Sequence, residues 1–238
     1  MNVRLSISRS RQGDRKRDFD RFEVEVAPGA TLLDALLSVR RLCDPSLVVR
    51  HSCMHASCGT CGVRVNGREA LACDTKLADL PASTIKVEPL SGQRVVADLA
   101  TDMVDFFARF EPAGMPLVRA SEAGPKAVPP LGIKAFSRFE NCIECGLCLG
   151  ACPIARADRA YIGPAALAAA ARVVAEPRGL ELGPVLALAS EPDSVWRCRD
   201  AMACTAVCPA AVDPARALLG LRRHVAWRGL KRLIRREA

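Results

Sequence analysis

The 238-residue sequence is poor in aromatic residues and lacks a long hydrophobic run. Phe, Trp and Tyr make up only 4% of the residues, too few for the stacked aromatic platforms that commonly bind single-stranded nucleic acid. The longest apolar stretch, Ile162 to Ala175, contains Arg172 and is shorter than the roughly 20 residues that a transmembrane helix needs. The sequence therefore predicts neither a membrane-spanning helix nor a stacking platform for nucleic acid.

The amino terminus also lacks the apolar core of a secretory signal peptide, because MNVRLSISRSRQGDRKRD is largely polar and basic. We therefore expect the chain in the reducing cytoplasm, where disulfides rarely persist. Lys and Arg number 34 against 26 Asp and Glu, and the net charge of +8 permits a polyanionic partner such as nucleic acid or an anionic membrane surface. Neither length nor charge identifies a function, and the spacing of the 12 cysteines is more informative.

The first part of the chain predicts a small mixed sheet with one packed helix. Apolar and polar residues alternate in several short segments, as in strands with one buried face. Thr31 and Asp34 have the spacing of a capping box at the start of a helix that ends before Asp44-Pro45. Asn66-Gly67 predicts a tight hairpin turn. The strand candidates are Val3–Ile7, Phe22–Val26, the two arms of Val63–Arg68, and Thr84–Glu88.

The second part is helical in character. A helix is predicted over Asp98–Phe110, and further helices run from Pro164 to about Glu176 and from Pro214 nearly to the carboxyl terminus. The residues that would share one face of the first of these helices are Leu99, Met103, Phe106, Phe107 and Phe110. We predict an α+β protein with a sheet-containing domain over residues 1–110, a linker rich in Pro, Gly and Ala over 111–130, and an all-helical domain over 131–238.

The first cysteine set is Cys53-x4-Cys58-x2-Cys61 followed by Cys73, which is the spacing of plant-type [2Fe–2S] ferredoxins. Gly59 and Gly62 within this loop would let backbone amides approach the cluster sulfurs without a Cβ clash. The alternative is a zinc site, but such sites usually contain two C-x2-C pairs, and this set has one.

The second set is Cys142-x2-Cys145-x2-Cys148-x3-Cys152-Pro153, the run found in bacterial ferredoxins that hold two clusters. In such proteins the fourth cysteine binds the other cluster, so a second run is expected. It occurs in altered form as Cys198-x5-Cys204-x3-Cys208-Pro209, where Ala201 takes the place of a cysteine.

The ligand count then predicts two clusters of different kinds. Cys142, Cys145, Cys148 and Cys208 would hold a [4Fe–4S] cluster, and the three remaining thiolates would hold a [3Fe–4S] cluster because Ala201 cannot bind a fourth iron. The three remaining thiolates are Cys152, Cys198 and Cys204. The alternative for this last site is a [4Fe–4S] cluster completed by water or another side chain. Cys43, the twelfth cysteine, is expected to be a buried, inert thiol.

With these motifs the sequence resembles the iron–sulfur subunit of succinate dehydrogenase and fumarate reductase, the complex II family, over nearly the whole chain. The matching stretches are 29–36 (GATLLDAL), 52–53 (SC), 58–61 (CGTC), 66–67 (NG), 71–73 (LAC), 96–99 (VADL), 142–148 (CIECGLC), 162–165 (IGPA) and 208–209 (CP). The resemblance implies a β-grasp [2Fe–2S] ferredoxin-like domain followed by an α-helical ferredoxin domain with [4Fe–4S] and [3Fe–4S] clusters.

The same resemblance implies a place in the tricarboxylic acid cycle and respiratory chain. Electrons would pass between the FAD of a flavoprotein subunit and a quinone at a membrane anchor, which in some members also carries haem. The chain would be peripheral, on the cytoplasmic face of the inner membrane, with no catalytic residue for the dicarboxylate and no nucleic-acid partner. Many members have a Trp shortly after the Cys-Pro that matches Cys152-Pro153 and a His directly after the cysteine that matches Cys198, both near the quinone. This chain has residues 154–157 (IARA) and Arg199 at these places. These differences leave open an alternative, a soluble multi-cluster redox carrier for another oxidoreductase.

The carboxyl-terminal segment is strongly basic. Residues 214–238 carry eight Lys and Arg and one acid, Glu237, together with regularly spaced aliphatic residues. We expect an amphipathic helix that faces anionic lipid headgroups or the cytoplasmic surface of an anchor, the alternative being a solvated helix end. Trp196 is expected to pack in the core, and His51 and His55 to be solvated loop residues rather than ligands.

Overall fold

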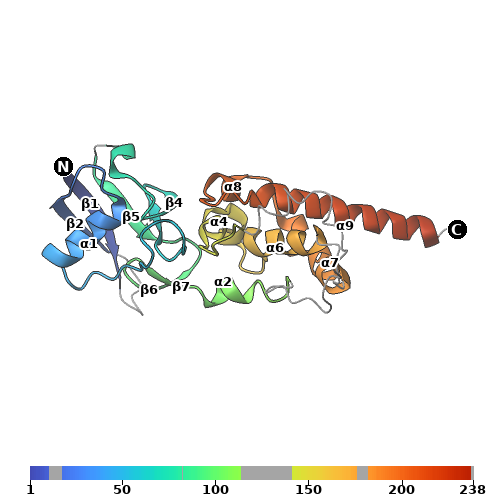
Figure 1. Cartoon of the computed structure of the whole chain (residues 1–238). Helices are drawn as coiled ribbons and strands as arrows, with labels where there is room; N and C mark the ends of the chain where they lie inside the picture. Colours follow the sequence, from blue (N-terminus) through green and yellow to red (C-terminus); the bar gives the residue numbers. More distant parts are fainter. Residues whose placement is uncertain (11–17, 82, 114–140, 176–181, 237–238) are drawn as a thin grey trace, which may run out of the picture. The chain divides into compact units, whose positions relative to one another are not determined.

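The protein is described by a computed structural model that covers residues 1–10, 18–81, 83–113, 141–175 and 182–236 (Figure 1). The chain forms two compact units. The first unit contains Met1–Asp105 and Ile143–Ala151, and the second contains Phe106–Cys142 and Cys152–Ala238. Each unit is built around its own set of elements.

The first unit is built on a five-stranded mixed sheet in the order β2-β1-β5-β3-β4 (Figure 1). β1 runs parallel to β5, and the other neighbouring strands are antiparallel. Alternate residues of β1, among them Leu5 and Ile7, are fully buried, as the sequence pattern predicts. The strands are β1 (Asn2–Arg9), β2 (Asp18–Glu25), β3 (Gly62–Val65), β4 (Arg68–Leu71) and β5 (Ile85–Pro89).

Local sequence signals set the helix and the tight turn of this unit. Helix α1 (Leu32–Leu42) begins at the predicted capping box: Asp34 N–H donates to the Thr31 hydroxyl, and the Asp34 carboxylate accepts from Thr31 N–H. The apolar face of α1 is buried. Asn66 and Gly67 both have positive φ angles, 48° and 88°, as the predicted tight turn between β3 and β4 requires.

Two expectations for this unit are wrong. Asp98–Phe110 is not one helix, since Arg94–Ala97 (β6) and Ala100–Asp102 (β7) form a hairpin and only Val104–Ala108 (α2) is helical. Cys43 is exposed rather than buried, because α1 ends there in contact with solvent.

The hairpin displaces the predicted helix because Asp98 has long-range partners. Its φ angle is +44°, its side chain is 7% exposed, and its carboxylate accepts hydrogen bonds from Arg9 Nε at 3.1 Å, Ser10 N–H at 3.1 Å and Val48 N–H at 2.8 Å. Asp98 thereby joins three chain segments, which a helix beginning at this residue would not allow.

The described elements of the second unit, which include the end of α2, are all helices. The Ala-rich α6 packs against α9 and α7, and its small buried side chains allow close helix–helix approach. Phe106 and Phe110 meet edge to face, with ring centroids 5.2 Å apart. The helices are α5 (Pro153–Ala157), α6 (Pro164–Ala175), α7 (Leu182–Ser190), η2 (Val195–Arg197), α8 (Ala203–Ala206) and α9 (Pro214–Arg236).

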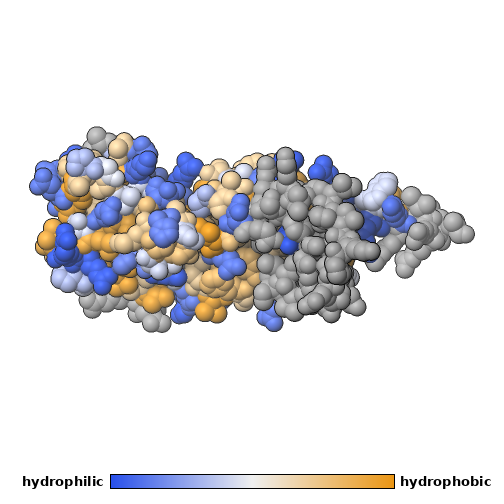
Figure 2. Space-filling model, viewed as in Figure 1, coloured by the Kyte–Doolittle hydropathy of each residue, from blue (hydrophilic) through white to orange (hydrophobic). Residues whose placement is uncertain are grey.

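α6 and α9 begin where the two prolines predict. The predicted end of α6 at Glu176 and most of the predicted linker, residues 114–130, lie outside the described residues. Among the residues that are described, no helix combines the length and the apolar character needed to cross a bilayer. Hydrophilic and hydrophobic side chains are interspersed over the visible face of the first unit (Figure 2).

Candidate iron–sulfur sites

The loop that carries the first three cysteines has an unusual backbone. Met54, Ala56 and Gly59 have φ angles of 63°, 60° and 71°, in the left-handed region that costs a residue other than glycine about 1 kcal/mol or more. This winding directs amide groups at sulfur: Ala56 N–H donates to Cys73 Sγ at 3.2 Å, and Ser57 N–H donates to Cys53 Sγ at 3.3 Å. The loop is therefore shaped to surround sulfur atoms with backbone donors.

The four thiols of this set form two pairs. Cys61 Sγ and Cys73 Sγ are 3.3 Å apart and both residues are buried, while the Cys53 and Cys58 thiols are hydrogen-bonded to each other. In a [2Fe–2S] cluster four thiolates serve two iron atoms. The chemistry of the donor set and the amides that point at sulfur fit such a cluster.

Hydrogen bonding and burial give these thiols different acidities. Backbone hydrogen bonding, chiefly from His55, lowers the pKa of Cys53 to about 7, and a hydrogen bond with the Thr60 hydroxyl lowers the pKa of Cys58. Burial raises the pKa of Cys61 to about 12. In the cluster-free chain Cys53 is thus readily deprotonated, whereas iron must displace a proton that is held more tightly at Cys61.

Gly59 connects this loop to the second cysteine run within the first unit. A Cβ atom at position 59 would lie 2.8 Å from Cys145 Cα and 2.8 Å from the Ile143 carbonyl oxygen, too close for any other residue. Gly59 therefore places the backbone of the first loop directly against Cys145.

Cys145 and Cys148 lie at the start of α4 (Leu147–Ala151). Glu144 and Gly146, on either side of Cys145, have φ angles of 52° and 76°, so the backbone winds around this cysteine as it does in the first loop. The other two members of the predicted set, Cys142 and Cys208, belong to the second unit. Their grouping with Cys145 and Cys148 remains a prediction from the spacing.

The second unit brings the three cysteines of the third predicted set together. Burial and the nearby charges of Cys152 and Cys198 raise the pKa of Cys204 to about 11. Tyr161, only 1% exposed, lies beside the same three thiols, and its pKa is raised by burial and by their charges. Tyr161 is thus a buried aromatic side chain near the three thiols, and a set of three cysteine donors fits a cluster with three cysteine ligands.

The loop from Cys198 to Cys204 is held by an arginine of α9. Arg222 donates from Nε to Val195 O at 3.1 Å and from Nη2 to Cys198 O at 2.9 Å, and its Nη2 lies 3.2 Å from Asp200 Oδ1. Asp200 N–H in turn donates to Cys198 Sγ at 3.4 Å. The exposed Ala201 lies in this loop, between Asp200 and Met202, whose φ angles are both 55°.

Sequence reasoning did not single out Tyr161, Arg222 or Arg109 for these sites. Arg109 donates to the carbonyl oxygens of Tyr161 and, at 3.3 Å, Ile162, and so supports the segment that carries Tyr161. Local patterns gave no signal for these contacts, because each partner lies far away along the chain. In the sequence Arg222 belongs to the basic carboxyl-terminal segment, and nothing in that segment indicates a bond to Cys198 O.

The remaining expectations have mixed outcomes. His51 and His55 are exposed as predicted, and a hydrogen bond joins His55 Nδ1 to Cys53 O. Trp196 was expected in the core but is 43% exposed, because it borders an open groove. Within the described ranges, no three His, Cys, Asp or Glu side chains are arranged around a single metal ion; the thiols of a cluster are instead divided among its iron atoms.

Comparison with known proteins identifies two domains that bind iron–sulfur clusters. Residues 4–108 match the family profile of a 2Fe-2S iron-sulfur cluster binding domain, and residues 138–212 match that of a 4Fe-4S dicluster domain. The chain carries clusters of both types, and a [3Fe–4S] cluster completes the set in this family.

Named relatives cover nearly the whole chain. It is 33% identical over 220 residues to a fumarate reductase iron-sulfur subunit of Mycobacterium tuberculosis (91% of this chain, 89% of the relative). It is 36% identical over 216 residues to a succinate dehydrogenase iron-sulfur subunit of Coxiella burnetii (88% and 90%). A chain of the Mycobacterium smegmatis Sdh1 complex in the apo form superposes with a TM-score of 0.84 at 25% identity, covering 95% of this chain and 96% of that one. The chain therefore belongs to the iron–sulfur subunits of the succinate dehydrogenase and fumarate reductase family.

Proposed function

We propose that this chain transfers electrons between the FAD of a flavoprotein subunit and a quinone at a membrane anchor, on the cytoplasmic face of the inner membrane. The observation that carries the proposal is the contact of Gly59 with Cys145. It brings the loop of one candidate centre against a candidate ligand of the next, as a relay of separate centres requires. The names of the relatives support the same role.

The cysteines divide among three centres in this proposal. Each bound cluster supplies one-electron chemistry, so that an electron pair from a flavin can pass on singly. The [2Fe–2S] ligands are Cys53, Cys58, Cys61 and Cys73; the [4Fe–4S] ligands are Cys142, Cys145, Cys148 and Cys208; and the [3Fe–4S] ligands are Cys152, Cys198 and Cys204. In this proposal the dicarboxylate reaction takes place on the flavoprotein, so this chain would contribute no catalytic side chain.

The residues around the thiols have supporting roles. Amide groups of Ala56, Ser57 and Asp200 donate to cysteine sulfurs, and such hydrogen bonds stabilise negative charge on a reduced centre. The buried Tyr161 would provide an apolar contact beside the third centre. Arg222 fixes the loop that carries Cys198.

The test is anaerobic purification of the tagged chain from its own cells. We expect about nine iron atoms per chain and a co-purifying flavoprotein. We also expect succinate to reduce the clusters, which electron paramagnetic resonance would detect. A Cys58→Ser variant should change the signal of the [2Fe–2S] centre alone. If the chain copurifies with a different oxidoreductase and its clusters respond to neither succinate nor fumarate, the soluble-carrier alternative is correct instead.

A further inference from the structure

The distal half of α9 presents a mixed basic and aromatic face to solvent. Four residues share one side of this part of the helix, because residues three or four positions apart lie on the same face. They are Arg223, Trp227, Leu230 and Lys231. All four are exposed, Trp227 by 59% and Leu230 by 48%. Lys231 Nζ lies 5.2 Å from the centroid of the Trp227 ring, close enough for a cation–π contact.

Other residues of α9 already provide its packing face. Leu218, Leu221 and Val225 are buried, and α9 packs against α6 and α7. Trp227 and Leu230 are therefore not needed for the core of this unit. Exposed apolar side chains among cations on one helix face are typical of a helix that lies in a membrane interface.

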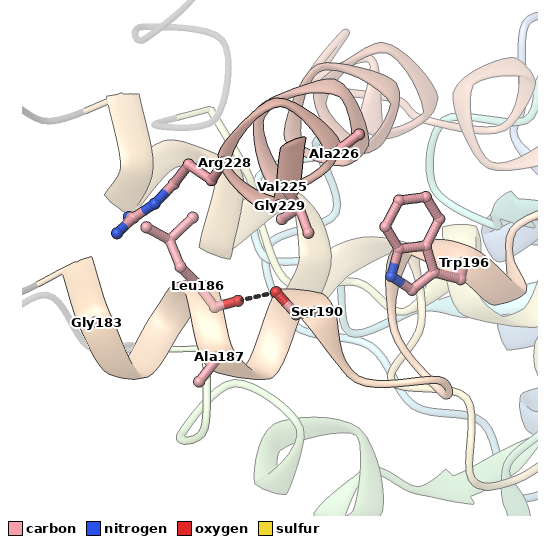
Figure 3. Close-up of a pocket in the computed structure, with 9 residues that line it drawn as sticks. All are labelled: Gly183, Leu186, Ala187, Ser190, Trp196, Val225, Ala226, Arg228 and Gly229. Atoms are coloured by element: carbon pink, nitrogen blue, oxygen red, sulfur yellow. Dashed lines mark hydrogen bonds between the residues drawn. The ribbon is translucent and has the colours of Figure 1, made fainter. Parts of the chain in front are cut away.

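A groove of about 430 Å³ lies beside this face, between α7 and α9. Its walls are mainly apolar, and Figure 3 shows the Arg228 guanidinium near one end and Trp196 near the other. The Ser190 hydroxyl in the groove already donates to Leu186 O at 2.6 Å. The main polar group in the groove that a ligand could contact is therefore the Arg228 guanidinium. The apolar walls beside it are suited to an acyl chain.

The charge of this region favours an anionic partner. The sequence of α9 contains no Asp or Glu. Two acids of the neighbouring η2–α8 region already have cationic partners, since Asp193 pairs with Arg197 and Asp200 with Arg222. Arg223, Arg228 and Lys231 thus form a basic surface around Trp227 and Leu230, and the two tryptophans of the chain both lie in this region.

We propose that the exposed face of α9 formed by Arg223, Trp227, Leu230 and Lys231, together with Arg228 at the adjoining groove, binds the surface of a bilayer that contains anionic phospholipid. The cations would contact headgroup phosphates, while Trp227 and Leu230 would enter the boundary between headgroups and acyl chains. The groove beside Arg228 would accommodate part of an acyl chain. This contact goes beyond the electron-transfer function and does not depend on which acceptor the clusters serve.

The test uses the full chain loaded with its clusters and phosphatidylcholine vesicles with or without one third phosphatidylglycerol. We expect cosedimentation with the anionic vesicles alone at low salt and release at about 0.5 M salt. Each cation near an anionic surface changes partitioning about fivefold. The double variant R228Q/K231Q should therefore bind about 25-fold more weakly.

A matched control is R40Q/R41Q, which removes the same charge from two exposed arginines in the last turn of α1. Its vesicle binding should stay within about twofold of the wild type. Equal losses in the two double variants, or equal binding of neutral vesicles, would overturn the proposal.

Tryptophan fluorescence provides a second readout. In a Trp196→Phe variant only Trp227 remains, and its emission should shift to the blue and be quenched by brominated lipid on vesicle binding. Unchanged emission would contradict the proposal. If the wild type binds no vesicles but R228Q/K231Q loses a co-purifying protein, the face is a protein interface and the lipid proposal is wrong.

Discussion

Gly59 lies against Cys145 with no room for a side chain between them, since a Cβ atom at position 59 would be 2.8 Å from Cys145 Cα. Two stretches of sequence more than 80 residues apart thus meet backbone to backbone. The contact joins the loop of the first candidate centre to a proposed ligand of the second.

The first prediction is that Gly59→Ala damages both neighbouring centres. The new methyl group would occupy a left-handed backbone position and clash with backbone atoms that cannot easily move, at a cost of about 2 kcal/mol or more. We expect a lower melting temperature, loss of iron and altered [2Fe–2S] resonance. Gly220→Ala is the control, because nothing lies within 4 Å of the added atom and alanine favours the helix by about 1 kcal/mol. Similar effects of the two variants would refute the proposed role of the contact.

The second prediction concerns the missing ligand at Ala201. Ala201→Cys should supply a fourth thiolate and convert the third centre to [4Fe–4S], raising the iron content to about ten per chain. The narrow signal close to the free-electron position, expected of the air-oxidised wild type, should then disappear. Ala206→Cys, which adds a thiol at an exposed site in α8, should retain that signal. An Ala201→Cys chain with the wild-type spectrum would show that the ligand assignment is wrong.

The third prediction is that Arg222 positions the loop of the third centre. Arg222→Gln should remove the ion pair with Asp200 and weaken the bonds to Val195 O and Cys198 O. We expect destabilisation by about 1–3 kcal/mol together with a broadened or shifted resonance of the oxidised third centre. Arg222→Lys should restore part of the stability but not the full set of bonds, because lysine lacks the planar fork.

Arg223→Gln is the neighbouring control, since Arg223 is exposed and is not among the partners of this loop. If Arg222→Gln melts earlier with an unchanged resonance and midpoint potential, Arg222 serves the fold alone.

The fourth prediction is a pH-dependent order of thiol reactivity in the cluster-free chain. Cys53, whose pKa is lowered to about 7, is half ionised at neutral pH. Its alkylation rate should fall about tenfold for each unit below pH 7 and level off above pH 8. Cys61, whose pKa is raised to about 12 and which is buried, should remain unmodified throughout this range.

Peptide mapping by mass spectrometry after brief iodoacetamide treatment measures both rates. Equal labelling of Cys53 and Cys61 at pH 7 would contradict the different environments of the two thiol pairs.

Local signals predicted most of the fold, and long-range contacts account for the errors. Thr31 and Asp34 cap a helix three residues apart, and Asn66-Gly67 forms a two-residue turn. Both structures could therefore be predicted from short segments of sequence. Asp98 bonds to Arg9 and Val48, far away along the chain, and those bonds override the helical pattern that follows it.

The candidate centres also have features that short sequence patterns predict and features that depend on long-range contacts. Cysteine spacing predicts that Cys152, Cys198 and Cys204 share one centre, because a cluster imposes a recognisable pattern on its ligands. It could not predict the roles of Arg222 and Tyr161, because neither a hydrogen bond to a distant carbonyl nor the burial of a side chain near the site produces such a pattern. Nor could it predict that Trp196 would be exposed, because this depends on how α7 and α9 pack.

The inclusion of Ile143–Ala151 in the first unit limits how the protein can be dissected. Leu147 Cδ2 would lie 3.4 Å from a Cβ atom on Gly62, and Gly150 approaches the side chain of Leu90. A fragment that stops at residue 110 would lose this covering segment and leave apolar surface bare. The ferredoxin-like part should therefore not behave as a separable module when expressed by itself, and it acquires its complete fold only after the ribosome has synthesised α4.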